Sequence, residues 1–167
     1  MHIDLDELIT TPAPADLTGC SLAELRSIRD QYQDVENGLS YARRIVQGRL
    51  DTVSVELERR RDGGPDGLLQ RLPDALAAHS RGAGLPRPRP DLEPPAWADG
   101  LLAGADQALP PTSFARLPDL TDDDLDTAAA ALGGLERELS AARNELHRTI
   151  DRVQDEVYAR EAVALGL

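Results

Sequence analysis

Aromatic residues make up only 3% of this 167-residue chain, and Cys20 is its only cysteine. So few large apolar side chains cannot fill a thick globular core, whereas long helices with narrow seams need only aliphatic residues. A single cysteine excludes an internal disulfide, and the simplest location for such a chain is the reducing cytoplasm. We therefore expect a helical, cytoplasmic protein.

The sequence also lacks the marks of several other protein classes. No apolar run approaches the roughly 18–20 residues of a membrane span, and the acidic N-terminus lacks the basic segment of a signal peptide. The three histidines show no metal-ligand spacing, and no glycine-rich loop could cradle a phosphate. The acidic residues have no visible nucleophile beside them. We expect no enzyme, no bound metal and no membrane contact.

Basic residues are too few to balance the acidic ones, which leaves a formal net charge of -12. Such a charge disfavours direct binding to DNA. It suits a partner with a basic surface, such as a DNA-binding protein.

A pattern of five polar residues occurs twice, one hundred positions apart. Its intervals of 4, 3, 4 and 4 residues are helical and confine each set to a strip roughly 80° wide. Matching residues recur at the same offset from Leu25 to Arg60, which indicates a duplicated helix. The first copy is Glu36, Ser40, Arg43, Gln47 and Asp51, and the second is Glu136, Ser140, Arg143, His147 and Asp151.

The apolar periodicity predicts two long helices, residues 21–62 and 121–165. In each helix the apolar residues that form the packing seam of a coiled coil follow one another at alternating steps of four and three residues. Both helices also contain one additional step of four residues. Ser21 and Glu24 fit a capping box at the start of the first helix. Residues 1–20 precede it. Residues 63–120 hold ten of the 12 prolines and form a Pro- and Gly-rich connection that can contain short helices. The expected fold class is all-α, an antiparallel two-helix coiled-coil hairpin.

Antiparallel pairing follows from where the polar residues lie. Each of them comes directly after a seam residue, and such positions flank one another only when the two helices run in opposite directions. Both copies then share one face with an approximate two-fold axis. A ligand for this face should itself be two-fold symmetric or nearly so.

A few other residues have two interpretations. Gly38 and Gly48 each cost about 1 kcal/mol in a helix interior relative to alanine. They are either tolerated on the surface or allow a ligand or partner to approach closely. Trp97 and Phe114 either cap the end of the hairpin or anchor a partner. Further arginines, among them Arg49, either form solvated ion pairs or extend a positive patch.

The chemistry of the motif suits a guanine nucleotide. Arginine binds guanine or phosphate with two hydrogen bonds, and carboxylates accept the donors of guanine's Watson–Crick edge. Ser and Gln can reach phosphates or sugar hydroxyls. A cyclic dinucleotide of guanine also has two-fold symmetry. The pattern Glu-x3-Ser-x2-Arg-x3-Gln-x3-Asp, present twice on a helical hairpin, resembles the RsiG family of actinomycete anti-sigma factors. The second copy departs from it at His147, where the family has Gln.

The resemblance implies a coiled coil that binds two molecules of cyclic di-GMP per chain through the ten motif residues. In that state it would sequester a sigma factor of the WhiG type, a flagellar-type sigma that acts in sporulation, and so block transcription. The alternative is a structural or adaptor coiled coil without a small ligand. In that case, motif substitutions would leave partner binding intact.

Overall fold

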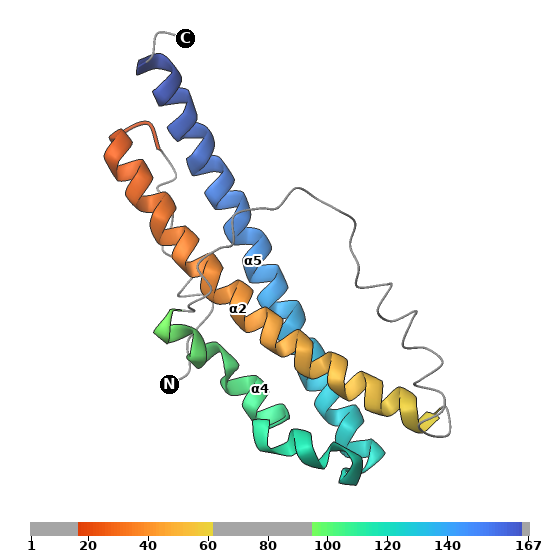
Figure 1. Ribbon diagram of the computed structural model, residues 1–167. Helices are drawn as coiled ribbons and strands as arrows, with labels where there is room; N and C mark the ends of the chain where they lie inside the picture. Colours follow the sequence, from red (N-terminus) through yellow and green to blue (C-terminus); the bar gives the residue numbers. More distant parts are fainter. Residues whose placement is uncertain (1–16, 62–94, 165–167) are drawn as a thin grey trace, which may run out of the picture.

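The computed structural model describes residues 17–61 and 95–164. Two long helices, α2 (Leu22–Arg61) and α5 (Asp122–Ala164), pack against each other and run in opposite directions (Figure 1). The described part of the chain contains no strand, so the expected all-α hairpin is confirmed. The expectations for residues 1–16, 62–94 and 165–167 lie outside the described residues.

Short helical elements form a third layer beside this hairpin, coloured green to teal in Figure 1. They are η1 (Ala96–Leu102), α4 (Ala103–Ala108) and η2 (Pro111–Asp119). η1 packs mainly on α2, whereas α4 packs on α5. None of the helices in the described ranges combines the length and apolar character that crossing a bilayer requires.

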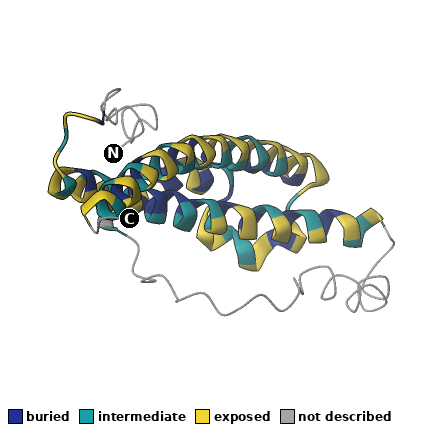
Figure 2. Cartoon of the chain, turned by 90° about the horizontal axis from the view of Figure 1, so that it is seen from above, coloured by how far each residue is buried: buried dark blue, intermediate teal, exposed yellow. Residues whose placement is uncertain are grey.

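The seam between α2 and α5 is built from the same positions of the two repeat copies. Figure 2 shows the buried residues gathered between the helices and the exposed ones on their outer faces. Each fully buried Leu or Val contributes about 1.5–3 kcal/mol, so this seam supplies most of the cohesion of the hairpin. The pairs buried in both copies are Leu25/Leu125, Tyr32/Leu132, Leu39/Leu139, Ala42/Ala142, Val46/Leu146, Val53/Val153 and Leu57/Val157.

Both long helices begin with a capping box. The Ser21 amide donates to Glu24 Oε2 at 2.7 Å, and the Glu24 amide donates to Ser21 Oγ at 3.2 Å. Thr121 and Asp124 exchange the equivalent bonds, each at 3.1 Å. The box expected at Ser21 is confirmed. The second box lies at an offset of one hundred, so the duplication extends back beyond Leu25.

An arginine near the end of each long helix binds the segment that leads into the other helix. Arg60 Nη2 donates to the Leu117 carbonyl at 3.0 Å, and Arg160 Nη2 donates to the Leu17 carbonyl at 2.8 Å. Leu17 and Leu117 are themselves equivalent positions of the repeat, and both are buried. These two contacts, which we call the end clamps, fix how far each helix extends past its partner.

A glutamate four residues earlier holds each clamp arginine in place. Arg60 Nε lies 2.8 Å from Glu56 Oε1, and Arg160 Nε lies 2.7 Å from Glu156 Oε1. Hydrogen bonds from Arg59 outweigh the effect of burial and, together with Arg60, lower the pKa of Glu56 to about 2. Glu56 therefore stays charged at any ordinary pH.

Trp97 in the third layer packs directly on Gly38 in α2. A Cβ atom built on Gly38 would lie 2.2 Å from the ring of Trp97, whereas one built on Gly48 would meet nothing within 4 Å. Gly38 is therefore a point of close approach, as one interpretation expected, but the approaching group belongs to the same chain. Because Gly38 lies well inside α2, Trp97 packs against the side of this helix and does not cap the end of the hairpin.

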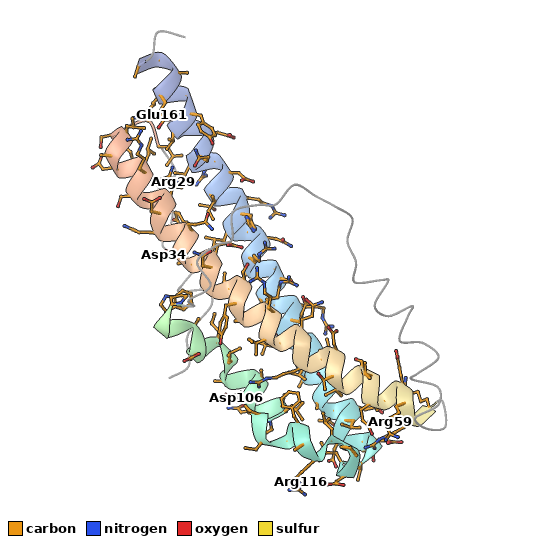
Figure 3. The ribbon with its side chains drawn as sticks, viewed as in Figure 1. Arg29, Asp34, Arg59, Asp106, Arg116 and Glu161 are labelled. Carbon is orange, nitrogen blue, oxygen red and sulfur yellow. The ribbon has the colours of Figure 1, made fainter. Side chains whose placement is uncertain are left out.

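Arg49 connects α2 to α4. Its guanidinium lies 2.7 Å from Asp106 Oδ1, a residue labelled in Figure 3, and donates to the Leu109 carbonyl at 3.3 Å. Its side chain is only 9% exposed. Arg49 is thus neither a solvated ion-pair partner nor part of a patch beside the motif.

The third layer and the polar motif occupy different sides of α2. At about 100° per residue, Gly38 lies roughly 160° around the helix from Glu36, and Arg49 roughly 140°. Because the third layer contacts both Gly38 and Arg49, it covers the side opposite the motif. The polar strip is left uncovered by these elements.

We expect the two helical glycines to respond in opposite directions to alanine. Gly38→Ala should destabilise the fold by about 1–3 kcal/mol, because its methyl group would overlap Trp97. Gly48→Ala should stabilise it by up to about 1 kcal/mol, because alanine is the better helix former and its site is open. Urea unfolding followed by circular dichroism measures both. Equal effects would show that Trp97 does not occupy the Gly38 face.

Candidate functional site

The two copies of the polar motif meet across the hairpin as reciprocal ion pairs. Arg143 Nε lies 2.8 Å from Glu36 Oε1, and Arg43 Nη1 lies 3.4 Å from Glu136 Oε1. In each pair, the arginine of one copy meets the glutamate of the other. Antiparallel pairing therefore brings the inner residues of both copies onto one face, which we call the polar face.

A serine one turn along each helix supports the glutamate of its own copy. Ser40 Oγ donates to Glu36 Oε1 at 2.6 Å, and Ser140 Oγ donates to Glu136 Oε1 at 2.8 Å. Arg143 Nε also donates to Ser40 Oγ at 2.8 Å. The spacing of four residues in the motif explains these contacts, since such residues are neighbours on a helix.

The outer motif residues are placed less uniformly. Gln47 Oε1 accepts a hydrogen bond from Arg43 Nη1 at 3.1 Å. His147 Nε2 lies 3.3 Å from Glu36 Oε1, on the opposite helix. Asp51 and Asp151 are exposed and have no partner among the described residues. The fold thus joins eight of the ten motif residues into two clusters and leaves both aspartates outside them.

One hydrogen-bond donor of Arg43 has no acceptor in the described part of the structure. Its Nε is buried and has no partner among the described residues. Such a donor costs about 1–3 kcal/mol when it stays unsatisfied. If the Arg43 side chain turned outward to meet a ligand, an acceptor atom of that ligand would remove that cost.

The ionisation of Glu36 is set by opposing effects. Burial raises the pKa of Glu36, but hydrogen bonds from Ser40 and Arg143, the charge of Arg143 and the nearby His147 outweigh burial and lower it. Its side chain is 10% exposed. Glu36 is therefore a buried carboxylate kept ionised by its donors.

Gln33 belongs to this site although the motif does not include it. Its Nε2 donates to Glu36 Oε2 at 3.2 Å. The equivalent position of the second copy is Gly133, so comparison of the copies gave no signal for Gln33. Its spacing of three residues from Glu36 is the only sequence feature that could have indicated it.

The polar face offers charge and hydrogen bonds rather than a metal centre. In residues 17–61 and 95–164, no group of three or more His, Cys, Asp or Glu side chains could hold a metal ion. Two guanidinium groups, two carboxylates and two hydroxyls are the groups that a bound molecule would meet.

Comparison with known families finds a similarity to one of them in the first part of the chain. A family model described as RsiG-like matches residues 11–76, a range that includes α2 and the first copy of the motif. The resemblance to RsiG is thereby confirmed for that part of the chain. The RsiG-like family is one of regulatory anti-sigma factors. No curated protein matches the chain.

Acid should weaken the contact between Glu36 and Arg143. The folded-state pKa of Glu36 lies below its ordinary value of 4.5, so its charge stabilises the fold fully above that pH. The contribution disappears as the pH falls through the folded-state value. Glu36→Gln should therefore flatten the acid-side loss of the free energy of unfolding, measured by urea titrations between about pH 3 and pH 6.

Asp151→Asn is the matched control for this experiment, because Asp151 is an exposed acid without a described partner. It should keep the pH dependence of the unmodified protein. An unchanged slope in Glu36→Gln would contradict the ion pair with Arg143.

Proposed function

We propose that this protein is an anti-sigma factor whose polar face binds two molecules of cyclic di-GMP. In that state it sequesters a sigma factor of the WhiG type and blocks transcription. The ligand contacts are assigned to the ten motif residues, with Arg43 and Arg143 at the centre. The observation that carries the proposal is the pair of reciprocal contacts Arg143–Glu36 and Arg43–Glu136 on one face, which the third layer leaves uncovered.

The symmetry of these contacts favours a symmetric ligand. The two copies are related by an approximate two-fold axis, because each arginine meets the glutamate of the other copy. Cyclic di-GMP has two chemically identical halves. A stacked pair of such molecules would present a guanine edge to each half of the face.

The energetics favour exchange of the internal contacts for ligand contacts. Arg43 and Arg143 are 27% and 33% exposed in their side chains. Ion pairs between partly exposed groups contribute about 0–1 kcal/mol, whereas a bidentate contact of arginine with guanine contributes about 1–3 kcal/mol. The unpartnered Arg43 Nε adds to this difference. Both arginines are therefore available for a ligand that offers better acceptors.

Charge also supports the assignment. Each cyclic di-GMP carries two negative charges, and an acidic chain of net charge -12 needs local arginines to hold it. Binding should weaken as salt rises, though less than for a protein that contacts many phosphates of duplex DNA. The same net charge suits a sigma factor, because sigma factors expose basic DNA-binding surfaces.

Arginine substitutions test the ligand site. Arg43→Ala and Arg143→Ala should each weaken cyclic di-GMP binding by about 1–3 kcal/mol, because each removes a two-pronged donor. Isothermal titration calorimetry measures the affinity, and the unmodified protein should bind two nucleotides per chain. Circular dichroism should show little loss of helix.

Arg116→Ala is the matched control, since Arg116 is an exposed arginine on η2, in the layer that covers the opposite side of α2. It should bind cyclic di-GMP like the unmodified protein. Unchanged binding in both motif variants would leave the alternative of an adaptor coiled coil without a small ligand. A ratio of one nucleotide per chain, or a site that needs two chains, would contradict the stacked pair.

Nucleotide and sigma factor should strengthen each other's binding. If the nucleotide prefers the form that binds sigma, that form must hold the nucleotide more tightly in return. Titration of a WhiG-type sigma factor into this protein, without and with saturating cyclic di-GMP, should give different affinities. Equal affinities would mean that the polar face binds nucleotide without controlling the partner.

A further inference from the structure

The two glutamates of the polar face differ in how fully their oxygens are used. Glu36 receives Ser40 and Arg143 on Oε1, with His147 Nε2 at 3.3 Å, and Gln33 on Oε2. Both of its oxygens are therefore engaged.

Glu136 has a simpler environment. Its Oε1 receives Ser140 at 2.8 Å and Arg43 at 3.4 Å, and its Oε2 has no partner among the described residues. Its side chain is 24% exposed, against 10% for Glu36. One oxygen of Glu136 is thus open to an incoming donor.

Two departures from the repeat account for this difference. Gln33, which holds Glu36 Oε2, is replaced by Gly133 in the second copy, and a glycine has no side chain to donate. His147 stands where the first copy has Gln47, and Gln47 binds Arg43 rather than Glu136. Both departures therefore act on Glu36 and leave Glu136 free of similar contacts.

The Watson–Crick edge of guanine carries two neighbouring N–H donors, and a carboxylate receives both with less loss of existing contacts when one of its oxygens has no partner. Glu136 can receive this edge directly, because Oε2 is open and only Oε1 has partners. Glu36 must first release Gln33 from Oε2, and it must also loosen its contact with His147. The release lowers the net gain from a guanine bound at Glu36.

Resting on the proposed function, we infer that Gln33 and His147 act as positioning residues that lock Glu36 and make the two halves of the polar face unequal. The half built on Glu136 and Arg43 contributes most of the affinity for cyclic di-GMP. The half built on Glu36 and Arg143 contributes less, because part of its binding energy replaces existing contacts. The lock combines Gln33, which lies outside the motif, with His147, the position at which the second copy departs from it.

A mutant cycle tests the lock. Gln33→Ala should raise the affinity for cyclic di-GMP roughly two- to tenfold, the equivalent of one hydrogen bond that no longer has to be broken. In a Glu36→Ala background the same change should have no effect, because Gln33 acts only through Glu36. Glu136→Ala should weaken binding more than Glu36→Ala. Calorimetric titration of the full-length protein measures all of these affinities.

His147→Gln supplies the second arm, since it restores the residue of the first copy and removes the contact with Glu36. It should also raise the affinity, and combination with Gln33→Ala should reduce the difference between Glu36→Ala and Glu136→Ala. Gln31→Ala is the matched control for Gln33→Ala, because Gln31 bonds to Ser27 on the same helix and to neither glutamate. It should leave the affinity unchanged.

The outcomes separate this inference from the function on which it rests. If Gln33→Ala lowers the affinity, or acts equally without Glu36, then Gln33 does not lock Glu36 and the inference is wrong while the ligand site stands. If the unmodified protein binds no cyclic di-GMP, the proposed function is wrong and the inference fails with it.

Discussion

The antiparallel packing of one apolar seam against its own copy is the constraint on which the other features depend. Because the buried positions of α2 recur in α5 at a fixed offset, only one direction of pairing places both polar strips on the same side. The end clamps then set the register, since Arg60 and Arg160 each bind the segment that begins the opposite helix. The contacts between Arg43 and Glu136 and between Arg143 and Glu36 follow from that register. The two copies of the duplicated sequence therefore form one surface with approximate two-fold symmetry on a single chain.

The sequence predicted this hairpin well because its signals are local and repeated. The helical period, the capping box at Ser21 and the duplication each depend on residues within a few turns of one another. The third layer was not predictable in the same way, because its contacts join residues far apart in the chain. Gly38 is unfavourable in a helix interior, but nothing in the neighbouring sequence shows that Trp97 packs against it. The sequence around Arg49 likewise indicates a solvent-exposed side chain, but its ion pair with Asp106 of α4 leaves that side chain only 9% exposed.

The limits of prediction within the site have a different cause. The motif is recognisable because it recurs, and recurrence cannot reveal what the two copies do not share. Gln33 has no counterpart in the second copy, and the replacement of Gln by His147 could be seen but not interpreted. Their effect becomes visible only once antiparallel pairing places His147 beside Glu36 of the other helix, at 3.3 Å. Departures from the repeat are therefore as informative about the site as the repeat itself.

Arginine suits every one of these long-range contacts, and the chain contains no lysine at all among its 18 basic residues. A guanidinium presents several donors in a fixed plane, so one side chain can join two or three acceptors that a lysine ammonium would hold less well. Arg49 joins Asp106 to a carbonyl, Arg60 joins Glu56 to Leu117, and Arg143 joins Glu36 to Ser40. In the end clamps the guanidinium donors bind groups of the hairpin itself, and these contacts fix the register of α2 against α5. On the polar face Arg43 Nε has no partner among the described residues, so this arginine is not fully committed to holding the hairpin together.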